Sequence, residues 1–231
     1  MRRKIILVAL LGALLVWTTG ATPVEVNGDL NALLQKMEKA HQELKSLKAE
    51  LKQQKINPQI GSTDTDYGTL IYKPAVGGKG RMRIDYTRPD TRTVSVVGEN
   101  FVFYQPRINQ VVKTTLAKAS KGRTSGYTSI IGLDGSVKNM AGNYNIQIVK
   151  DEVINGQMTT QLHLVPKTPG QITSLDIWVS HQNYLPVQQK FIERNGDYTI
   201  VQLINLETNI KLADEAFIVK YPSSTVVVDK I

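Results

Sequence analysis

From Tyr67 onward, apolar and polar residues alternate in short runs that turn-forming residues separate. Alternation with a period of two predicts strands with one buried face, and turns about every ten residues favour an antiparallel meander over helix-linked parallel strands. The pattern predicts ten strands and two shorter strand-like segments near the end of the chain. The strands are residues 67–73, 81–86, 92–97, 100–105, 109–116, 143–150, 159–165, 173–180, 185–193 and 198–206, and the final segments are Phe217–Tyr221 and Thr225–Val228.

The segment before the strands has the three- and four-residue spacing of an amphipathic helix. Residues 27–44 predict one helix, which Asn27 or Asp29 can cap. A helix with a single apolar stripe is expected to lie on a hydrophobic core. The stripe consists of Leu30, Leu33, Leu34, Met37, Ala40 and Leu44.

Three further segments have less distinct patterns. Residues 47–53 fit a continued helix, because Leu47 and Leu51 keep the helical period, and they also fit a strand, because apolar and charged residues alternate. Of these two structures we favour the strand. Residues 57–66 predict a turn-rich loop, and residues 127–133 predict a short helix after a polar stretch.

One face of the predicted sheet is apolar and the other is mostly polar. Because a large antiparallel sheet tends to curl or close, we expect the apolar face to be concave and the helix to cover it. The predicted fold is mainly β (α+β), a curled antiparallel sheet under a helical lid, and the pattern leaves open whether side chains fill the interior or leave a cavity. The apolar face comprises Leu70, Tyr72, Met82, Ile84, Tyr86, Val94, Val96, Phe101 and Phe103, and the apolar exceptions on the other face are Ile71, Val97, Val102 and Tyr104.

The N-terminus predicts an export signal. Residues 1–4 carry three basic side chains, and residues 5–17 form an apolar run that is shorter than the roughly 20 residues of a membrane-spanning helix. We expect cleavage after Ala21, which gives a signal peptide of residues 1–21 and a single mature domain of residues 22–231. An uncleaved anchor is the alternative.

An export signal changes how the net charge and the absence of cysteine are interpreted. The formal net charge of +8 includes the three basic residues of the signal, so the mature charge is 8 − 3 = +5, and nucleic acid is not expected as a partner. The chain has no cysteine, which excludes thiol enzymes, disulfide scaffolds and acylation of the mature chain on a cysteine. Basic residues concentrate in 73–92 and 113–123, either as solvated strand edges or as a docking surface for anionic lipid or an acidic partner.

Patterns for catalysis and metal binding are weak. His41, His163 and His181 have no metal-ligand neighbour at the spacing of zinc motifs. The sequence has no nucleophile elbow or dinucleotide fingerprint, and residues 77–80 (GGKG) are typical of a hairpin turn between two strands rather than a phosphate-binding loop. We therefore predict a protein with no catalytic residue, no cofactor and no metal site.

Three stretches carry a family resemblance: GTLIYKP (68–74), MRIDYTRPD (82–90) and VSVVGENFVFYQ (94–105). With FIVKYP (217–222) near the end, their order over most of the chain resembles LolA, the periplasmic outer-membrane lipoprotein carrier family. One departure from the family's pattern is Ile84, which stands at the family's tryptophan position.

The resemblance implies an incomplete β-barrel with a helical lid, whose apolar cavity receives acyl chains. It further implies a soluble, monomeric, periplasmic carrier that takes acylated lipoproteins from an inner-membrane extraction complex to an outer-membrane acceptor, with transient membrane contact. Leu33, Leu34 and Met37 of the lid, together with the nine side chains of the apolar face, would contact the chains. The residues that would close the lid are Lys73, Ile130 and Ile131.

The main alternative is a carrier or sensor of another lipid or glycolipid on the same scaffold. A secreted hydrolase predicts convergent polar residues inside the cavity, and a glycan-binding module predicts exposed aromatic side chains on a flat face. We find no such polar residues, and the Phe/Tyr-lined face with its positive rim could serve a glycan-binding module only if its aromatic side chains were exposed rather than beneath the predicted helix.

Overall fold

A computed structural model describes residues 26–75, 80–119 and 137–228. Helix α1 (Val26–Glu43) precedes a 12-stranded sheet, and none of the described helices is long and apolar enough to cross a membrane. The strands are β1 (Leu47–Asn57), β2 (Ser62–Lys73), β3 (Arg81–Arg88), β4 (Arg92–Val97), β5 (Asn100–Gln105), β6 (Gln110–Thr115), β7 (Tyr144–Ile154), β8 (Gln157–Pro166), β9 (Ile172–Ser180), β10 (Pro186–Glu193), β11 (Tyr198–Thr208) and β12 (Val226–Val228). The shorter helices are η1 (Pro106–Ile108), α2 (Leu116–Ala119), α4 (Val137–Asn143) and η3 (Asp214–Phe217).

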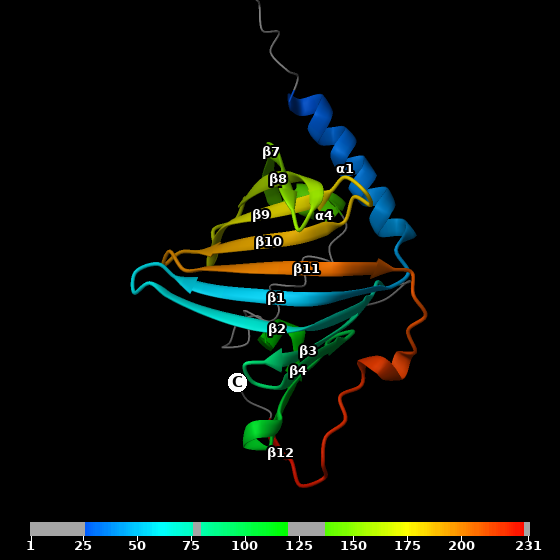
Figure 1. The fold of residues 1–231 in the computed structure, drawn as a ribbon, viewed down its shortest axis with the longest axis vertical. Coiled ribbons are helices and arrows are strands. Elements are labelled where there is room, and N and C mark those ends of the chain that lie inside the picture. Colours follow the sequence, from blue (N-terminus) through cyan, green and yellow to red (C-terminus); the bar gives the residue numbers. More distant parts are fainter. Residues whose placement is uncertain (1–25, 76–79, 120–136, 229–231) are drawn as a thin grey trace, which may run out of the picture.

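The sheet is one curled layer in the order β12-β6-β5-β4-β3-β2-β1-β11-β10-β9-β8-β7. Strands that follow each other in sequence pair mostly as antiparallel hairpins, while β1 and β11 join the two halves and β12 pairs with β6 in parallel. The edge strands β7 and β12 lie at opposite ends of the sheet, so it does not close into a barrel (Figure 1). α1 lies beside the ends of β9 and β10 and packs against α4 and β7 (Figure 1). The predicted fold class is confirmed.

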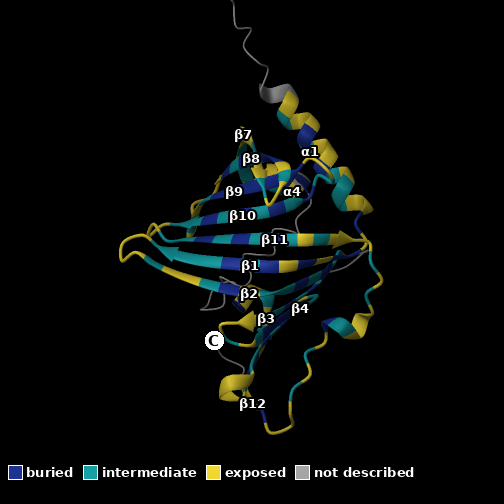
Figure 2. Ribbon diagram, in the orientation of Figure 1, coloured by how far each residue is buried: buried dark blue, intermediate teal, exposed yellow. Residues whose placement is uncertain are grey.

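The alternation of residues in the sequence becomes an alternation of burial, which Figure 2 shows as dark blue segments along the strands. On β3, for example, Met82, Ile84 and Tyr86 are buried, whereas Arg83 and Asp85 between them are only half-buried. All nine side chains of the predicted apolar face are buried. Burying a large apolar side chain stabilises a fold by roughly 1.5–3 kcal/mol, so the nine side chains of this face contribute substantially to stability.

The outer face was predicted to be solvated, and for β4 this is wrong because the chain after β11 covers it. We call residues 209–225 the C-terminal strap. Phe217 of the strap is fully buried, and its carbonyl oxygen accepts a hydrogen bond from Ser95 Oγ at 2.6 Å. Ser95 is consequently buried although it points away from the interior, and Thr93 on the same face is buried with its hydroxyl donating to Asp85 Oδ1.

Part of the strap was predicted as a strand, Phe217–Tyr221, and this is wrong. Asp214–Phe217 form the 3-10 helix η3, and residues 218–221 join no sheet. The alternating sequence here reflects a segment that places Phe217 into the outer face rather than a paired strand. The final predicted segment is confirmed, since Val226–Val228 form β12.

Two other predictions concern the N-terminal half of the sheet. The predicted strand at 47–53 is confirmed and extends to Asn57. The predicted loop 57–66 is wrong in its second half, because Ser62–Asp66 pair with the end of β1 and belong to β2. These residues are polar, and only the register with β1 makes them a strand.

Helix α4 was not predicted from the sequence. Several other predictions lie outside the described residues: the signal peptide, the turn residues 77–79, and the helix 127–133 with Ile130 and Ile131.

Candidate functional site

The wall formed by β2–β5 is a ladder of apolar side chains on the concave face. Their partners are set by the antiparallel register, which places an apolar side chain opposite another on every neighbouring strand. The wall is therefore continuous. Each such cross-strand pair stabilises the sheet by roughly 0.2–1 kcal/mol, and together the pairs hold the strands in one register. The pairs are Leu70–Ile84, Tyr72–Met82, Met82–Val96, Ile84–Val94, Val94–Phe103 and Val96–Phe101.

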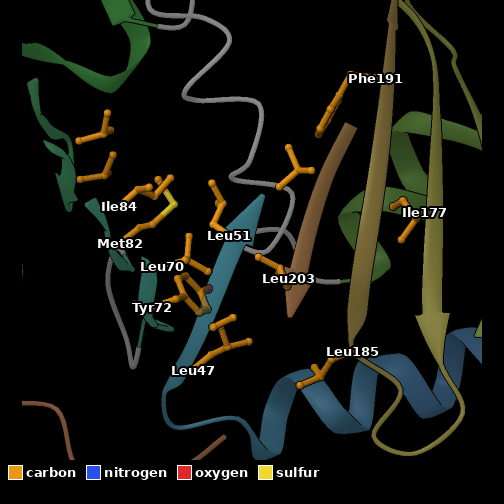
Figure 3. Close-up of a cluster of buried hydrophobic side chains, with 14 of the residues drawn as sticks. Leu47, Leu51, Leu70, Tyr72, Met82, Ile84, Ile177, Leu185, Phe191 and Leu203 are labelled. Atoms are coloured by element: carbon orange, nitrogen blue, oxygen red, sulfur yellow. The ribbon is translucent and has the colours of Figure 1, made fainter. Parts of the chain in front are cut away.

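A second apolar wall faces the first from β8–β11. Figure 3 shows Met82 and Ile84 pointing toward the interior from one side and Phe191 and Ile177 lying on the other, with Leu51 between them. All of these side chains belong to a single buried cluster. The interior that sequence reasoning predicted is therefore lined by two sheet halves, and the protein's own side chains pack along it.

Helix α1 adds apolar side chains at one end of this interior. Leu33 and Met37 are buried, and Leu34 is half-buried against the same cluster. On the solvent side of α1, the Lys36 ammonium lies 5.1 Å from the ring centre of Tyr184 in the β9–β10 loop. A hollow of about 410 Å³ separates the C-terminal half of α1 from this loop. The helix is thus attached by a narrow apolar stripe, as the lid hypothesis requires.

Polar side chains gather on the concave face at the level of Gln53. The Tyr86 hydroxyl donates to Gln53 Oε1 at 2.7 Å, and the Arg92 guanidinium lies 4.7 Å from the centre of the Tyr86 ring. Arg92 also forms an ion pair with Asp66 at 2.5 Å, and both side chains are mostly buried. Burial lowers the pKa of the nearby Lys55 ammonium, and the charge of Asp66 opposes this shift.

A family model described as "Outer membrane lipoprotein carrier protein LolA" matches residues 42–220, which is most of the chain. The protein belongs to the LolA family. No curated protein matches the chain. The resemblance inferred from the sequence is confirmed.

Solved structures show the same fold for this LolA-family chain. An uncharacterized conserved protein from Thermus thermophilus matches with a TM-score of 0.56 at 10% identity, over 87% of this chain and 99% of that chain. A DUF1329 family protein from Desulfovibrio piger gives 0.50 at 15% identity, over 83% and 96%. A chain of the MucA/MucB complex of Pseudomonas aeruginosa gives 0.51 at 12% identity, over 83% of this chain and 61% of that one. At these identities the likeness concerns the fold alone.

Lys73 of this LolA-family protein contacts the C-terminal strap. Its ammonium donates to Asp214 Oδ1 at 2.9 Å and to the Leu212 carbonyl at 3.4 Å, and Arg81 also pairs with Asp214. The Lys73 ammonium, followed by the Arg81 guanidinium, holds the pKa of the Asp214 carboxyl below its usual range. The role of Lys73 in closing the lid stays a prediction.

The strap explains much of the basic stretch 73–92. Arg83 donates two hydrogen bonds to Asp85 and two more to the Ala216 and Ile218 carbonyls of the strap. With Lys73 and Arg81 on Asp214, three of the basic residues in this stretch contact the strap. Their charge holds the strap onto the outer face.

Two of the three histidines, His163 and His181, have ordinary hydrogen-bond partners. His163 Nδ1 lies 2.7 Å from Asp176 Oδ1, and His181 Nε2 lies 2.8 Å from Thr160 Oγ1. No group of three or more His, Asp or Glu side chains in the described ranges is arranged to hold a metal ion.

Sequence reasoning missed the polar level of the interior. Gln53 follows Leu47, Ala49 and Leu51 in the inward phase of β1, so a polar residue in phase with apolar ones was the available signal. Gln189 carries the same signal on β10, between Val187 and Phe191. The predicted acyl-chain residues of the sheet are brought together on one wall, and the three of α1 join them at one end of the interior.

Proposed function

We propose that this LolA-family protein is an exported, non-catalytic carrier that binds the acyl chains of lipoproteins between the two walls of its sheet. It would act in the periplasm as a monomer, receiving cargo from an inner-membrane extraction complex and delivering it to an outer-membrane acceptor. The observation that carries the proposal is the continuous apolar wall of β2–β5 facing a second apolar wall, with α1 attached at one end.

The energetics explain why such an interior is needed. Each acyl CH₂ moved out of a membrane costs about 0.8 kcal/mol unless another apolar surface receives it. Leu70, Ile84 and Phe101 are fully buried in the described structure, so chains enter only when the walls or α1 separate. The contacts made inside the protein then compete with those made to cargo, which keeps the affinity moderate and permits release.

A carrier or sensor of another lipid is the second candidate. The apolar walls select acyl chains in general and contain nothing that demands a protein attached to them. The MucA/MucB structure is a complex of two proteins that includes a similar fold, which supports partner binding as a further property of this scaffold.

Mass spectrometry of the protein purified from its host tests the proposal. Co-purifying acylated lipoproteins are expected, whereas free lipids or glycolipids would favour the second candidate. Material without any acyl chain would contradict both.

A photo-crosslinker placed on β5 tests where the chains bind. Phe103 is 7% exposed and faces the interior, and its neighbour Tyr104 faces outward, so p-benzoylphenylalanine replaces an aromatic residue at either position. We expect lipoprotein acyl chains to cross-link at position 103 and not at 104. Equal cross-linking at both positions would show that the interior is not the binding site.

A further inference from the structure

Two glutamine side chains interrupt the apolar interior at the same level of the sheet. Gln53 on β1 and Gln189 on β10 are both in register with Val201 on β11, the strand between them. They therefore lie on the same concave face, two strand spacings or about 10 Å apart at the backbone. Both are buried, with 0% and 5% of their surface exposed.

Each glutamine has one buried polar atom that lacks a hydrogen-bond partner among the described residues, Nε2 of Gln53 and Oε1 of Gln189. The hydroxyl of Tyr86 donates to Gln53 Oε1, which leaves the Nε2 group of Gln53 as the free donor. Buried donors and acceptors in folded proteins almost always have partners, because an unmade bond is expensive in a dry interior. The concave face thus carries one unpaired donor and one unpaired acceptor on the side chains of Gln53 and Gln189.

The donor is held in place by its neighbours. Tyr86 lies with its ring 4.7 Å from the Arg92 guanidinium, and Arg92 pairs with Asp66, the residue opposite Gln53 on β2. This buried arrangement fixes the tyrosine hydroxyl and, through it, the orientation of the Gln53 amide. The free Nε2 group is consequently preorganised, which reduces the entropy lost on binding.

We propose that Gln53 and Gln189 bind the amide group of an N-acylated ligand. Gln53 Nε2 donates to the amide carbonyl, and Gln189 Oε1 accepts from the amide N–H. An amide presents its acceptor and its donor on opposite edges, so one amide can bridge two side chains that rise from alternate strands. The acyl chain attached to it lies on the apolar residues of the adjoining levels, such as Leu51 and Leu203.

This inference rests on the proposed function, since it assigns the part of the cargo that the polar level recognises. A chain attached through an amide nitrogen can form the hydrogen bonds to both glutamines. An ester-linked chain has no N–H and satisfies Gln53 alone, and a plain hydrocarbon satisfies neither.

Two tail-matched probes separate the two hydrogen bonds. N-methyldodecanamide has a carbonyl and an N–H, and N,N-dimethyldodecanamide has the carbonyl only. Their affinities for the full mature protein are measured by displacement of N-phenyl-1-naphthylamine, an apolar dye whose fluorescence rises in apolar sites. The variants are Gln53→Leu and Gln189→Leu, and the matched control is Gln54→Leu, the outward-facing neighbour on β1.

We expect the two interior variants to differ in which probes they weaken. Gln53→Leu weakens both probes by about five- to tenfold, the change for one hydrogen bond. Gln189→Leu weakens N-methyldodecanamide by the same factor and leaves N,N-dimethyldodecanamide unchanged, and Gln54→Leu changes neither. Equal affinities in wild type and both interior variants would overturn the inference while leaving the carrier function intact. Failure of both probes to displace the dye from wild type would instead contradict acyl-chain binding itself.

A measurement on the unaltered protein covers the case in which a variant does not fold. In ¹H–¹⁵N spectra, the side-chain NH₂ signals of Gln53 are expected to shift on titration with N-methyldodecanamide, and those of Gln54 to stay in place. Unchanged Gln53 signals at saturation would exclude the proposed contact.

Discussion

At the scale of single residues, Gly68 shows how closely two strands approach. A Cβ at this position would lie 2.4 Å from the Asp85 carbonyl oxygen, at an irregularity of the β2–β3 register. Neither the β2 nor the β3 backbone can move away without breaking the hydrogen bonds between the two strands. This glycine also belongs to the first stretch that resembles the LolA family, so the close approach gives a physical reason for the residue.

Gly68→Ala is therefore expected to lower the free energy of unfolding by about 1–3 kcal/mol, the usual cost of overpacking. Urea unfolding followed by circular dichroism measures it. The matched control is Gly142→Ala in α4, where a Cβ would meet nothing within 4 Å and helix propensity favours alanine. If both variants had wild-type stability, the close approach at Gly68 would be refuted.

Asp214 makes the hold on the strap sensitive to acid. Its pKa is lowered in the folded state, first by Lys73 and then by Arg81. A lowered carboxyl pKa stabilises the fold above its unfolded value, about 3.9, and the benefit is lost as pH falls through the folded value. At neutral pH, Asp214→Asn should speed amide exchange at Ala216 and Ile218. The difference from wild type should begin to shrink below about pH 3.9 and should vanish only when the pH falls below the lowered pKa of the folded state.

The neighbouring substitution Glu215→Gln serves as the control for this acid dependence, because the acidic side chain of Glu215 is exposed and forms no ion pair within the described residues. It should leave exchange in the strap unchanged at every pH. An undiminished difference between Asp214→Asn and wild type at pH 3 would contradict the role given to Asp214.

At the scale of elements, the attachment of α1 depends on a strained loop. Tyr184 has a φ of +56°, a region that a bulky side chain rarely adopts and that costs roughly 1–3 kcal/mol. Its ring packs against the core cluster and under the Lys36 ammonium of α1. The contacts of the Tyr184 ring offset the cost of this backbone conformation and attach the loop to α1, so we expect the attachment to weaken when the ring is removed.

Tyr184→Asn should keep the backbone, since asparagine tolerates positive φ, but remove the ring. Losing a cation–π contact of about 0.5–1 kcal/mol should raise amide exchange in α1 by about two- to fivefold. Hydrogen exchange with mass spectrometry measures it. Tyr67→Asn removes an exposed ring that stacks on Arg88 instead, and it should leave α1 unaffected. Equal protection of α1 in all three proteins would rule out Tyr184 as its latch.

At the scale of the whole molecule, both faces of β4 are covered by other parts of the protein. The inward side chains of β4 pack in the interior, and Phe217 of the strap covers the outward ones. Phe217→Ala should cost about 3–5 kcal/mol, because it leaves a cavity on the outer face. Ile218→Ala, at a position 56% exposed, should change stability by less than about 0.5 kcal/mol. Similar losses for both in chemical unfolding would show that the strap is not anchored by Phe217.

Much of the fold followed from local pattern. The nine residues of the apolar face are all buried, because a period of two fixes which side chains share a face wherever a strand forms. The same argument predicted the stripe of α1, in which Leu33 and Met37 are buried, and it extended that stripe to Leu44, which is buried just after the helix ends. It failed for Ser62–Asp66 and for Phe217–Tyr221, whose states depend on partners far away in the sequence.

By itself, the sequence determined the faces of the strands and of α1 and the family resemblance, since these depend on the order of neighbouring residues. Only the tertiary structure decided which strands meet. The pairing of β1 with β11 brings Gln53 and Gln189 to one level although 136 positions separate them in the chain (189 − 53), and the strap returns to bind Lys73 and Arg83. Register and long-range charge pairing carry no local signal, because their free energy is gained only after the chain has folded back on itself.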